Sequence, residues 1–397
     1  MKLAERVGQI KPSLTLAVDT KAKAMEKAGM DVVSFGVGEP DFDTPEHIKE
    51  AAVKALREGF TKYTAVGGTD ELKEAIAYRF KEDLGLSYGL DEIVVSCGGK
   101  HALYNIAQAL WGPGDKIIVP APFWVSYPPM ILLAGAEPVI VQTKAENGFK
   151  LTPAELQAVL TPETRAIILN SPSNPTGSVY SKKELEALGE VILKHDLTVI
   201  SDDIYDKILF DDPSFFNLPM VDPRFIERTL VVNGVSKTYS MTGWRIGYLA
   251  GPKPVIGAIN KIQSHSTSNP TSIAQKASVA ALKGPQDFVK MMVTEFDRRR
   301  KMISERLKGI PGVKVFDPKG AFYIFPDFSS YYGRKAGERV LSNSLDLADY
   351  LLEKALIAVV PGAAFGEDGC IRFSYATSME QIEKGLDRLE KGLRELS

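Results

Sequence analysis

The chain has 397 residues, 44% of them hydrophobic and 25% charged, an ordinary globular composition with more material than one compact domain usually holds. The formal net charge of -2 provides no basic excess for nucleic acid, so small molecules are the expected ligands. Cys97 and Cys370 have no second Cys or paired His nearby, which argues against a disulfide framework or zinc site and favours a reducing compartment. With no signal-peptide core and no run of ~18 apolar residues, a cytoplasmic protein that does not span a membrane is expected.

Short β-branched runs alternate with segments of helical period between about residues 91 and 251. This pattern predicts an α/β domain with a mostly parallel sheet covered by helices on both faces. The expected strands lie at residues 92–96, 116–119, 138–141, 166–169, 198–200, 230–232 and 246–250.

After Gln275 the sequence changes to charged amphipathic helices such as 288–308, a strand-like segment at 321–326 and a closing helix from Ser378. We therefore predict a smaller α+β domain. The expected division is an N-terminal arm and part of the small domain at 1–45, a large domain at 46–277 and the small domain at 278–397. One stripe of the last helix is apolar, which favours packing on its own domain over a coiled-coil seam. The stripe comprises Ile382, Leu386, Leu389, Leu393 and Leu396.

Polar residues follow three of the predicted strands, where an open parallel sheet binds its ligand. The run 166–169 leads into a Pro-rich loop containing Asn174, and the run 198–200 leads into Asp202 and Tyr205. The run 230–232 leads to Lys237, with Arg245 eight residues further on. Taken singly, these residues are equally typical of a turn, a helix N-cap or a surface cation.

The combination of these residues matches the chemistry of pyridoxal 5'-phosphate. Lys237 can form a Schiff base with an aldehyde, and a carboxylate such as Asp202 keeps a pyridine nitrogen protonated. Arg245 can hold a phosphate through paired hydrogen bonds. A second anion site is expected where a strand ends in Gly98 and Gly99 and a helix begins, although a plain strand-to-helix turn has the same pattern.

The segment 234–247, GVSKTYSMTGWRIG, resembles the cofactor-lysine signature of the class I and II aminotransferases of fold type I. Within that family the chain looks most like the bacterial aspartate aminotransferase branch, which includes aspartate/prephenate aminotransferases. Supporting motifs occur in the expected order over essentially the whole chain, at 38–45, 61–64, 174–177, 202–205 and 372–377. The resemblance implies a mostly parallel central sheet in a large cofactor-binding domain and a smaller α+β domain.

The resemblance also implies roles toward the cofactor. Lys237 would be the catalytic residue, linked to the cofactor and moving the substrate proton. Asp202 would pair with the pyridinium nitrogen, while Asn174 and Tyr205 would bind the ring hydroxylate; Asp203 would be structural. Trp124 would stack on the ring, where a core aromatic is otherwise the default. The residues expected near the phosphate are Ser236, Arg245, Gly99, Lys100 and, from a neighbouring subunit, Tyr63. That last contribution implies a homodimer with composite sites.

Toward the substrate, Arg372 would bind the α-carboxylate bidentately, with Gly38, Asn174 and Trp124 close by. The distal carboxylate of aspartate would meet Lys100 and the hydroxyls of Ser13 and Thr15, and Lys11 is a further candidate for prephenate. In one departure, Gly234 stands where some relatives have a Ser that meets the phosphate, so another donor must substitute.

The implied reaction converts L-aspartate and 2-oxoglutarate to oxaloacetate and L-glutamate, with ping-pong kinetics. Conversion of prephenate to arogenate stays open, as do an aminotransferase for aromatic amino acids or alanine and a pyridoxal-phosphate C–S β-lyase. A non-catalytic cofactor-sensing regulator is the remote alternative, because such a protein usually adds a basic DNA-binding domain. No metal, nucleic-acid or membrane partner is expected.

Overall fold

A sheet of seven strands forms the centre of the protein. The computed structural model describes residues 1–211 and 214–397. The sheet has the order β2-β8-β7-β6-β5-β3-β4, in which β8 runs antiparallel to its neighbours β2 and β7 and the other neighbours are parallel. Its strands are β2 (Ile93–Ser96), β3 (Lys116–Ala121), β4 (Glu137–Gln142), β5 (Thr164–Asn170), β6 (Thr198–Asp202), β7 (Thr229–Gly234) and β8 (Gly247–Ala250). Every apolar run expected to be a strand is therefore in this sheet, and the mostly parallel α/β architecture is confirmed.

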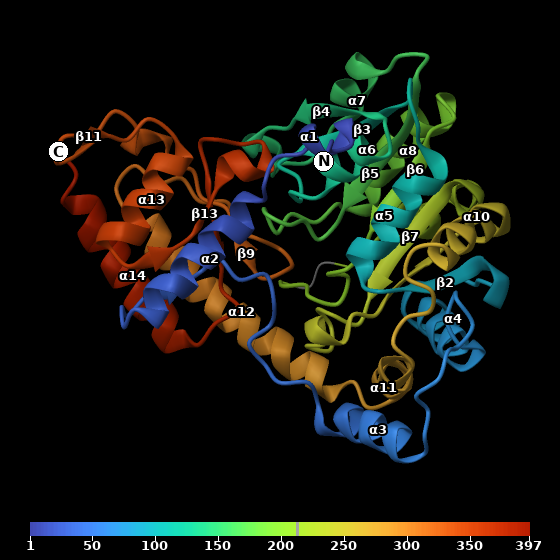
Figure 1. The fold of residues 1–397 in the computed structure, drawn as a ribbon. Coiled ribbons are helices and arrows are strands. Elements are labelled where there is room, and N and C mark those ends of the chain that lie inside the picture. The colour runs from blue at the N-terminus through green and yellow to red at the C-terminus, as the bar shows by residue number, and fades with distance from the viewer. Residues whose placement is uncertain (212–213) are drawn as a thin grey trace.

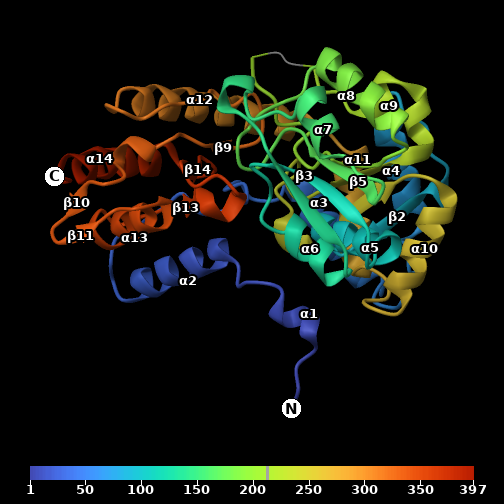
Figure 2. The ribbon, with the colours of Figure 1, turned by 90° about the horizontal axis from the view of Figure 1, so that it is seen from above.

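Helices cover both faces of the sheet (Figures 1 and 2). One face packs against α3 (Glu46–Arg57), α4 (Asp70–Leu84), α7 (Pro153–Val159), α8 (Lys182–Lys194), α9 (Leu218–Val221) and α11 (Ser272–Lys283). The other packs against α5 (Gly99–Leu110), α6 (Tyr127–Leu133) and α10 (Lys253–Ser264). Val94 and Val95 illustrate the alternation, since they are buried in the cores on opposite faces. Burial on both faces explains why these strands are continuous apolar runs.

A second unit lies beside the sheet, at the left of Figure 1. Its helices are α12 (Asp287–Lys308), α13 (Ser344–Lys354) and α14 (Met379–Arg394). Its strands are β9 (Tyr323–Ile324), β10 (Lys335–Ala336), β11 (Arg339–Val340), β12 (Ile357–Ala358), β13 (Val360–Pro361) and β14 (Ile371–Ser374). The 321–326 segment is thus a strand over only two residues. The apolar stripe of the closing helix is buried in the core of this unit, which confirms that it packs there, and Ser378 caps α14.

The N-terminal segment joins this second unit. The strand β1 (Val33–Ser34) pairs in parallel with β12, and Ala22 of α2 (Leu14–Lys27) is buried against Leu352 and Ala358. The helix α1 (Glu5–Gly8) has no buried residue and contacts α6, and the chain before it extends away from the body in Figure 2. No helix within residues 1–211 and 214–397 has the length and apolar character needed to cross a membrane.

Candidate active site

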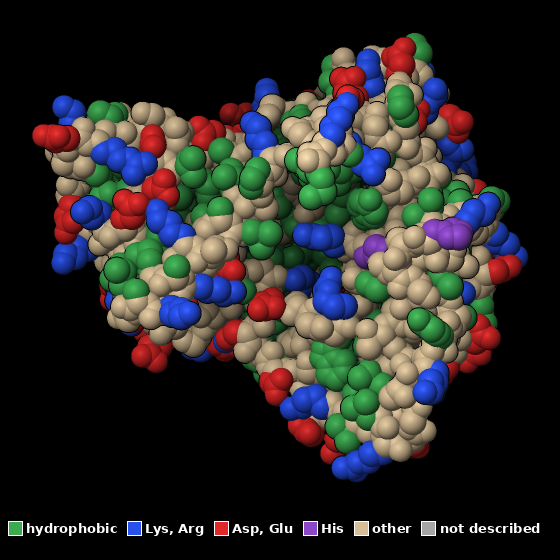
Figure 3. All heavy atoms as spheres, viewed as in Figure 1, with side chains coloured by type: hydrophobic (Ala, Val, Ile, Leu, Met, Phe, Trp, Pro, Cys, Tyr) green, Lys and Arg blue, Asp and Glu red, His purple; other side chains and the backbone are tan. Residues whose placement is uncertain are grey.

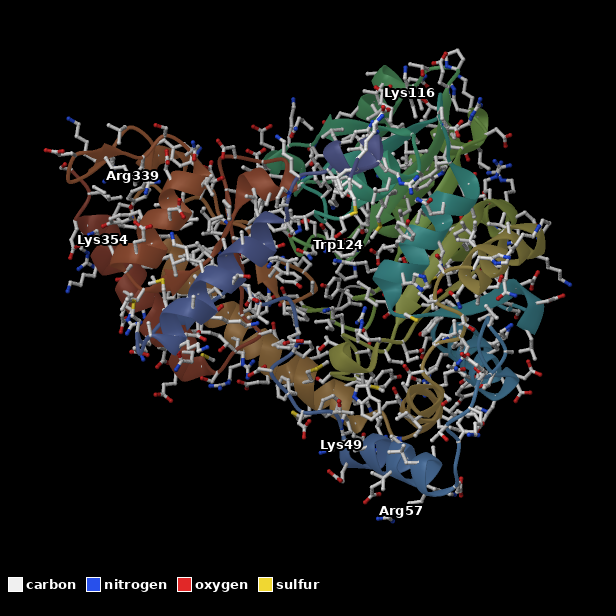
Figure 4. All side chains as sticks on the ribbon, viewed as in Figure 1. Lys49, Arg57, Lys116, Trp124, Arg339 and Lys354 are labelled. Carbon is white, nitrogen blue, oxygen red and sulfur yellow. The ribbon has the colours of Figure 1, made fainter. Side chains whose placement is uncertain are left out.

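The carboxyl ends of β5 and β6 bring two of the predicted residues together. Asp202 is the last residue of β6, and Asn174 lies in the loop after β5. Asn170 ties them together, because its Nδ2 donates to the Asp202 carbonyl oxygen and its Oδ1 accepts from the Asn174 N–H, each over 2.9 Å. Trp124, labelled in Figure 4, lies between the sheet and the second unit. Figure 3 shows a hollow in this region, with Lys and Arg side chains around it.

Lys237 lies in the turn after β7 with its side chain half-buried. Its Nζ donates to the Gly38 carbonyl oxygen and lies 6.0 Å from the centre of the Phe322 ring. Burial lowers the pKa of Lys237 to about 8; Glu39 opposes this shift, and the cations Arg245 and Arg372 add to it. A lowered pKa raises the neutral fraction of the amine near neutral pH, and the neutral amine is the nucleophilic form.

Asp202 is a buried carboxylate near enough to this amine for the charge of Lys237 to affect its pKa. Burial raises its pKa to about 6, against the opposing effects of a hydrogen bond from Tyr127, the Ile204 N–H and the charge of Lys237. The Tyr127 hydroxyl donates to Oδ2 over 2.6 Å. Because burial disfavours an isolated carboxylate, Asp202 would be stabilised by a cation placed against it.

Asp203 has a separate set of partners. Ser201 Oγ donates to its Oδ1 over 2.6 Å and Asn217 Nδ2 donates to its Oδ2 over 2.8 Å. The same Asn217 side chain caps α9. Burial raises the pKa of Asp203 to about 8. These contacts tie the end of β6 to α9, as a structural residue would.

The turn from β2 to α5 has no side chain at Gly98 and Gly99, and we call this turn the cradle. Gly98 caps α5 with φ 95° and no side-chain hydrogen bond. The N–H of His101 and of Ala102 binds the Gly98 carbonyl oxygen. Within the described chain, the N–H groups of Gly99 and Lys100 have no such partner. The positive end of a helix with free N–H groups is suited to an anion.

Arg245 packs against this cradle. Its Nη1 donates to the Thr242 carbonyl oxygen over 2.7 Å and its Nη2 to the Cys97 carbonyl oxygen over 3.3 Å. A Cβ atom added to Gly98 would lie 2.3 Å from Arg245 Nη2, and one added to Gly247 would lie 2.1 Å from the Gly99 nitrogen. The close approach of Arg245 to this turn therefore requires Gly98, and the close approach of β8 to the turn requires Gly247.

Two neighbouring predicted residues lie beside this turn. Ser236 is buried directly before Lys237. At Gly234 a Cβ atom would lie 3.1 Å from the Gly247 Cα and 3.2 Å from an Ile204 methyl group. A side chain at residue 234 is therefore disfavoured in this chain by tight packing.

Arg372, on β14, is buried beside Asn174. Its Nη1 donates to the Asn174 Oδ1 over 3.0 Å and its Nη2 to the Gly36 carbonyl oxygen over 2.8 Å. Its guanidinium lies 4.6 Å from the Tyr323 ring centre and 5.0 Å from that of Phe365. Among the described residues its Nε has no hydrogen-bond partner. A buried guanidinium with an unsatisfied N–H is suited to an anionic ligand.

Asn174, Asp202, Tyr205, Lys237, Arg245 and Arg372 are called the cluster from here on. The remaining predicted residues have fewer contacts with it. Lys100 Nζ lies 5.0 Å from the Trp124 ring centre. The hydroxyls of Ser13 and Thr15 are 2.7 Å apart, and Ser13 caps α2. Tyr63 is 90% exposed. Within residues 1–211 and 214–397, no hydrogen bond links the Ser13, Thr15 or Tyr63 side chains to the cluster.

Two tyrosines that the sequence did not single out contact the cluster. Tyr127 binds Asp202, as described, and packs edge-on against Trp124, with ring centres 5.4 Å apart. The Tyr323 hydroxyl lies 2.9 Å from that of Tyr205. Tyr127 opens α6, and in the sequence it directly precedes an apolar run, which is the pattern of a core residue. Tyr323 lies in a short apolar strand, and nothing in its sequence context distinguishes it from a core residue.

The fold and this cluster define an aminotransferase of the pyridoxal-phosphate type. Residues 30–389 match the family model described as aminotransferase class I and II. The chain belongs to this family, in its aspartate branch, and its cofactor is pyridoxal 5'-phosphate. Amino acids and 2-oxo acids are accordingly its substrate classes.

Full-length relatives agree with this assignment. The chain is 48% identical to a probable aspartate/prephenate aminotransferase of Rickettsia felis, covering 100% of this chain and 97% of the relative. It is 47% identical to an aspartate aminotransferase of Geobacillus stearothermophilus, with 98% of each covered. A crystal structure of the Rhizobium meliloti aspartate aminotransferase aligns with a TM-score of 0.97 and 44% identity over 100% of both chains. That of the Thermus thermophilus aspartate aminotransferase with maleate aligns with a TM-score of 0.93 and 44% identity, covering 99% of this chain and 100% of the other.

The residues of the cluster fit the cofactor. Lys237 offers an amine of lowered pKa, and Asp202 offers a buried carboxylate that a pyridinium would stabilise. The turn at Gly98 and Gly99 presents free N–H groups at the start of α5, with Arg245 beside it, which suits a phosphate.

Proposed function

We propose that the protein transfers the amino group of L-aspartate to 2-oxoglutarate, giving oxaloacetate and L-glutamate. The observation that carries the proposal is the grouping of Lys237 and Asp202 with the partly unsatisfied Arg372, which is hydrogen-bonded to Asn174. Together they supply an amine, a counter-ion for a pyridinium and a receptor for a carboxylate.

In this proposal the large unit holds the cofactor. Lys237 Nζ forms the covalent link, Asp202 pairs with the ring nitrogen, and Asn174 and Tyr205 hydrogen-bond the ring oxygen. The N–H groups at the start of α5 and the side chains of Ser236 and Arg245 would hold the phosphate. Trp124 would stack on the ring.

The substrate α-carboxylate binds Arg372 and completes its hydrogen bonding. The unpaired Nε supports this proposal, because a bidentate carboxylate satisfies an unpaired guanidinium edge. Asn174 Oδ1 holds Nη1 and Gly36 holds Nη2, so the guanidinium is already oriented. Gly38 offers its backbone to the same substrate.

The distal carboxylate binds Lys100, with Ser13 and Thr15 as hydroxyl donors. The position of the Lys100 amine over Trp124 supports this assignment. The Thermus thermophilus relative was solved with maleate, a dicarboxylate, and other relatives are named for both aspartate and prephenate. Prephenate carries two carboxylates as well, so we propose it as a second substrate, with Lys11 as a further cation.

When bound, pyridoxal phosphate withdraws electrons from the α-carbon of the amino acid and makes the proton on that carbon acidic. Lys237 Nζ takes up this proton and later delivers it as the general acid. Asp202 stays ionised against the ring nitrogen. Arg372 holds the substrate so that the α-carbon stays within reach of Lys237.

We also propose a homodimer with composite sites, in which Tyr63 of each subunit binds the phosphate in the other. An aromatic side chain that is 90% exposed in the single chain supports this contribution. The large unit would comprise residues 46–277, and the small unit residues 278–397 with part of 1–45. Both cysteines are free, which supports a cytoplasmic location.

The substrate assignment is tested by comparing aspartate with alanine as donors to 2-oxoglutarate in the wild type and in Lys100→Gln. Alanine has no distal carboxylate and is the matched control. We expect kcat/KM for aspartate to fall by about 10- to 100-fold, because a charge-assisted hydrogen bond is lost, while kcat/KM for alanine changes little. An equal loss for both donors would refute the role of Lys100 toward the distal carboxylate, and turnover of neither donor by the wild type would refute the proposed reaction.

A further inference from the structure

Tyr323 occupies a position between the two units. It lies on β9 and is 1% exposed. β9 pairs with β14, so that Tyr323 is opposite Ser374, two residues after Arg372. Its hydroxyl partner Tyr205 lies instead in the turn after β6 of the large sheet. The hydrogen bond between the two hydroxyls therefore joins the two units at the site.

The hydroxyl of Tyr323 contacts Tyr205, the residue proposed to bind the ring oxygen of the cofactor. Its oxygen lies 2.9 Å from that of Tyr205, and either hydroxyl can be the donor. Burial raises the pKa of both tyrosines, so both keep their protons. A Cβ atom added to Gly38 would lie 3.2 Å from the same oxygen. If Tyr205 donates to the cofactor ring oxygen, the proton of Tyr323 is free to be donated to Tyr205.

The ring of Tyr323 contacts Arg372, the residue proposed to bind the substrate α-carboxylate. The Arg372 guanidinium lies 4.6 Å from its centre, a distance typical of a cation–π contact. The contact restrains the plane of the guanidinium, while Asn174 and Gly36 hold its two terminal nitrogens. One side chain thus contacts both the residue proposed to bind the cofactor oxygen and the residue proposed to bind the α-carboxylate.

We propose that Tyr323 is a positioning residue for both subsites: its hydroxyl donates to Tyr205 and strengthens the hydrogen bond of Tyr205 to the cofactor, and its ring orients Arg372. The proposal rests on the proposed roles of Tyr205 and Arg372. The physical basis of the first part is that a hydroxyl that accepts a hydrogen bond becomes a stronger donor. The basis of the second is the attraction of a buried cation to an aromatic face.

The two parts predict different effects for two substitutions. Tyr323→Phe removes the hydroxyl and keeps the ring, whereas Tyr323→Leu removes both. Tyr205 stabilises the anionic ring oxygen and so favours the deprotonated lysine–cofactor linkage. A weaker donor at Tyr205 must therefore raise the pKa of this linkage, which is read from the pH dependence of the visible absorption band and is called the band pKa. We expect a rise of about 0.3 to 0.6 units in Tyr323→Phe.

Maleate serves as the probe of the carboxylate subsite in the cofactor-loaded enzyme. We expect Tyr323→Phe to bind maleate within about twofold of the wild type, because the ring under Arg372 is kept. Tyr323→Leu should bind it about 3- to 30-fold more weakly, because the cation–π contact is lost. Unchanged maleate affinity in Tyr323→Leu would overturn the role of the ring.

Tyr331→Phe is the matched control. Tyr331 is also buried, donates its hydroxyl to the Pro311 carbonyl oxygen over 2.7 Å and lies under the Arg334 guanidinium at 4.4 Å, away from the cluster. The Tyr331→Phe substitution should leave both the band pKa and the affinity for maleate unchanged. A band pKa in Tyr323→Phe equal to that of this control would overturn the role of the hydroxyl.

A double substitution shows whether Tyr323 acts through Tyr205. In a Tyr205→Phe background, Tyr323→Phe should cause no further rise of the band pKa, because the intermediate hydroxyl is gone. A rise of equal size in both backgrounds would contradict the proposal. Failure of the proposed function has a different signature, because then the wild type itself would show no visible band after loading with pyridoxal phosphate.

Discussion

At the scale of single residues, Lys237 combines an amine of lowered pKa with neighbours that can hold a cofactor and a carboxylate. We predict that Lys237→Ala loses at least about 10³-fold in turnover, because it removes both the covalent link and the general acid–base group. Reduction with borohydride followed by peptide mass spectrometry should place the cofactor on Lys237 in the wild type. Lys253→Ala, which removes an exposed lysine paired with Asp91, is the control and should retain full activity. Full turnover of Lys237→Ala would refute the mechanism.

The raised pKa of Asp203 should make the stability of the cofactor-free protein depend on pH. Burial raises its pKa from 3.8 to about 8, so the folded state binds this proton more tightly than the unfolded state. Its contribution to stability is fully present below pH 3.8 and is lost as the pH rises through 8. Urea unfolding of wild type and Asp203→Asn at pH 5 and pH 9, at roughly equal ionic strength, measures this. The free energy of unfolding should fall more between these pH values in the wild type than in the variant, and parallel falls would contradict the assignment.

The chemistry of the site could largely be predicted from the sequence, whereas its internal contacts could not. Lys237, Asp202 and Asn174 follow predicted strands, and parallel strands place such residues at one edge. The contacts of Tyr127 with Asp202 and of Tyr205 with Tyr323 join residues 75 and 118 positions apart. Both missed tyrosines lie in apolar segments that have the pattern of core residues, so only the packed fold shows that their hydroxyls face the site.

At the scale of elements, the turn between β2 and α5 is shaped by the absence of side chains. We predict that Gly98→Ala weakens binding of pyridoxal phosphate by about 10- to 100-fold, because the new methyl group displaces Arg245 and removes a charge-assisted contact. Fluorescence titration of the cofactor-free protein measures this affinity.

Gly85→Ala separates backbone strain from loss of the cradle. Gly85 also has a positive φ, 70°, but a Cβ atom there meets nothing within 4 Å. That variant should lose about 1 kcal/mol of stability and keep its cofactor affinity. If both alanine variants bound the cofactor equally well, the cradle would not be the phosphate site.

The strands of the large sheet were predictable because burial on both faces makes each one a continuous apolar run. The exact ends were less predictable, since β5 and β3 each extend beyond the expected run into polar or proline positions. The pairing of β1 with β12 brings Val33 opposite Ile357. The two residues are far apart in the sequence, and no local sequence pattern specifies such a long-range contact. In two-residue strands of this kind, tertiary packing decides the conformation.

At the scale of the whole molecule, composite sites predict complementation between inactive chains. A Tyr63→Ala subunit and a Lys237→Ala subunit each lack one part, but a mixed dimer assembles one complete site. Random mixing makes about half of the dimers hybrid, and each hybrid has one intact site out of two. About a quarter of all sites are then intact, so activity should recover to about a quarter of the wild-type value. Activity is assayed at subsaturating cofactor after unfolding and refolding the two chains together. No recovery in mixtures shown to contain hybrids would mean that Tyr63 does not act across subunits.

The proposed function rests on transfer of the amino group from aspartate to the cofactor at Lys237. The most direct measurement is the absorption spectrum of the cofactor-loaded wild type on addition of aspartate without any acceptor. We predict that the visible band is replaced by a near-ultraviolet band, that oxaloacetate appears in an amount equal to the enzyme sites, and that 2-oxoglutarate restores the visible band. An unchanged band with aspartate, or continuous release of ammonia without an acceptor, would contradict transamination of aspartate by this protein.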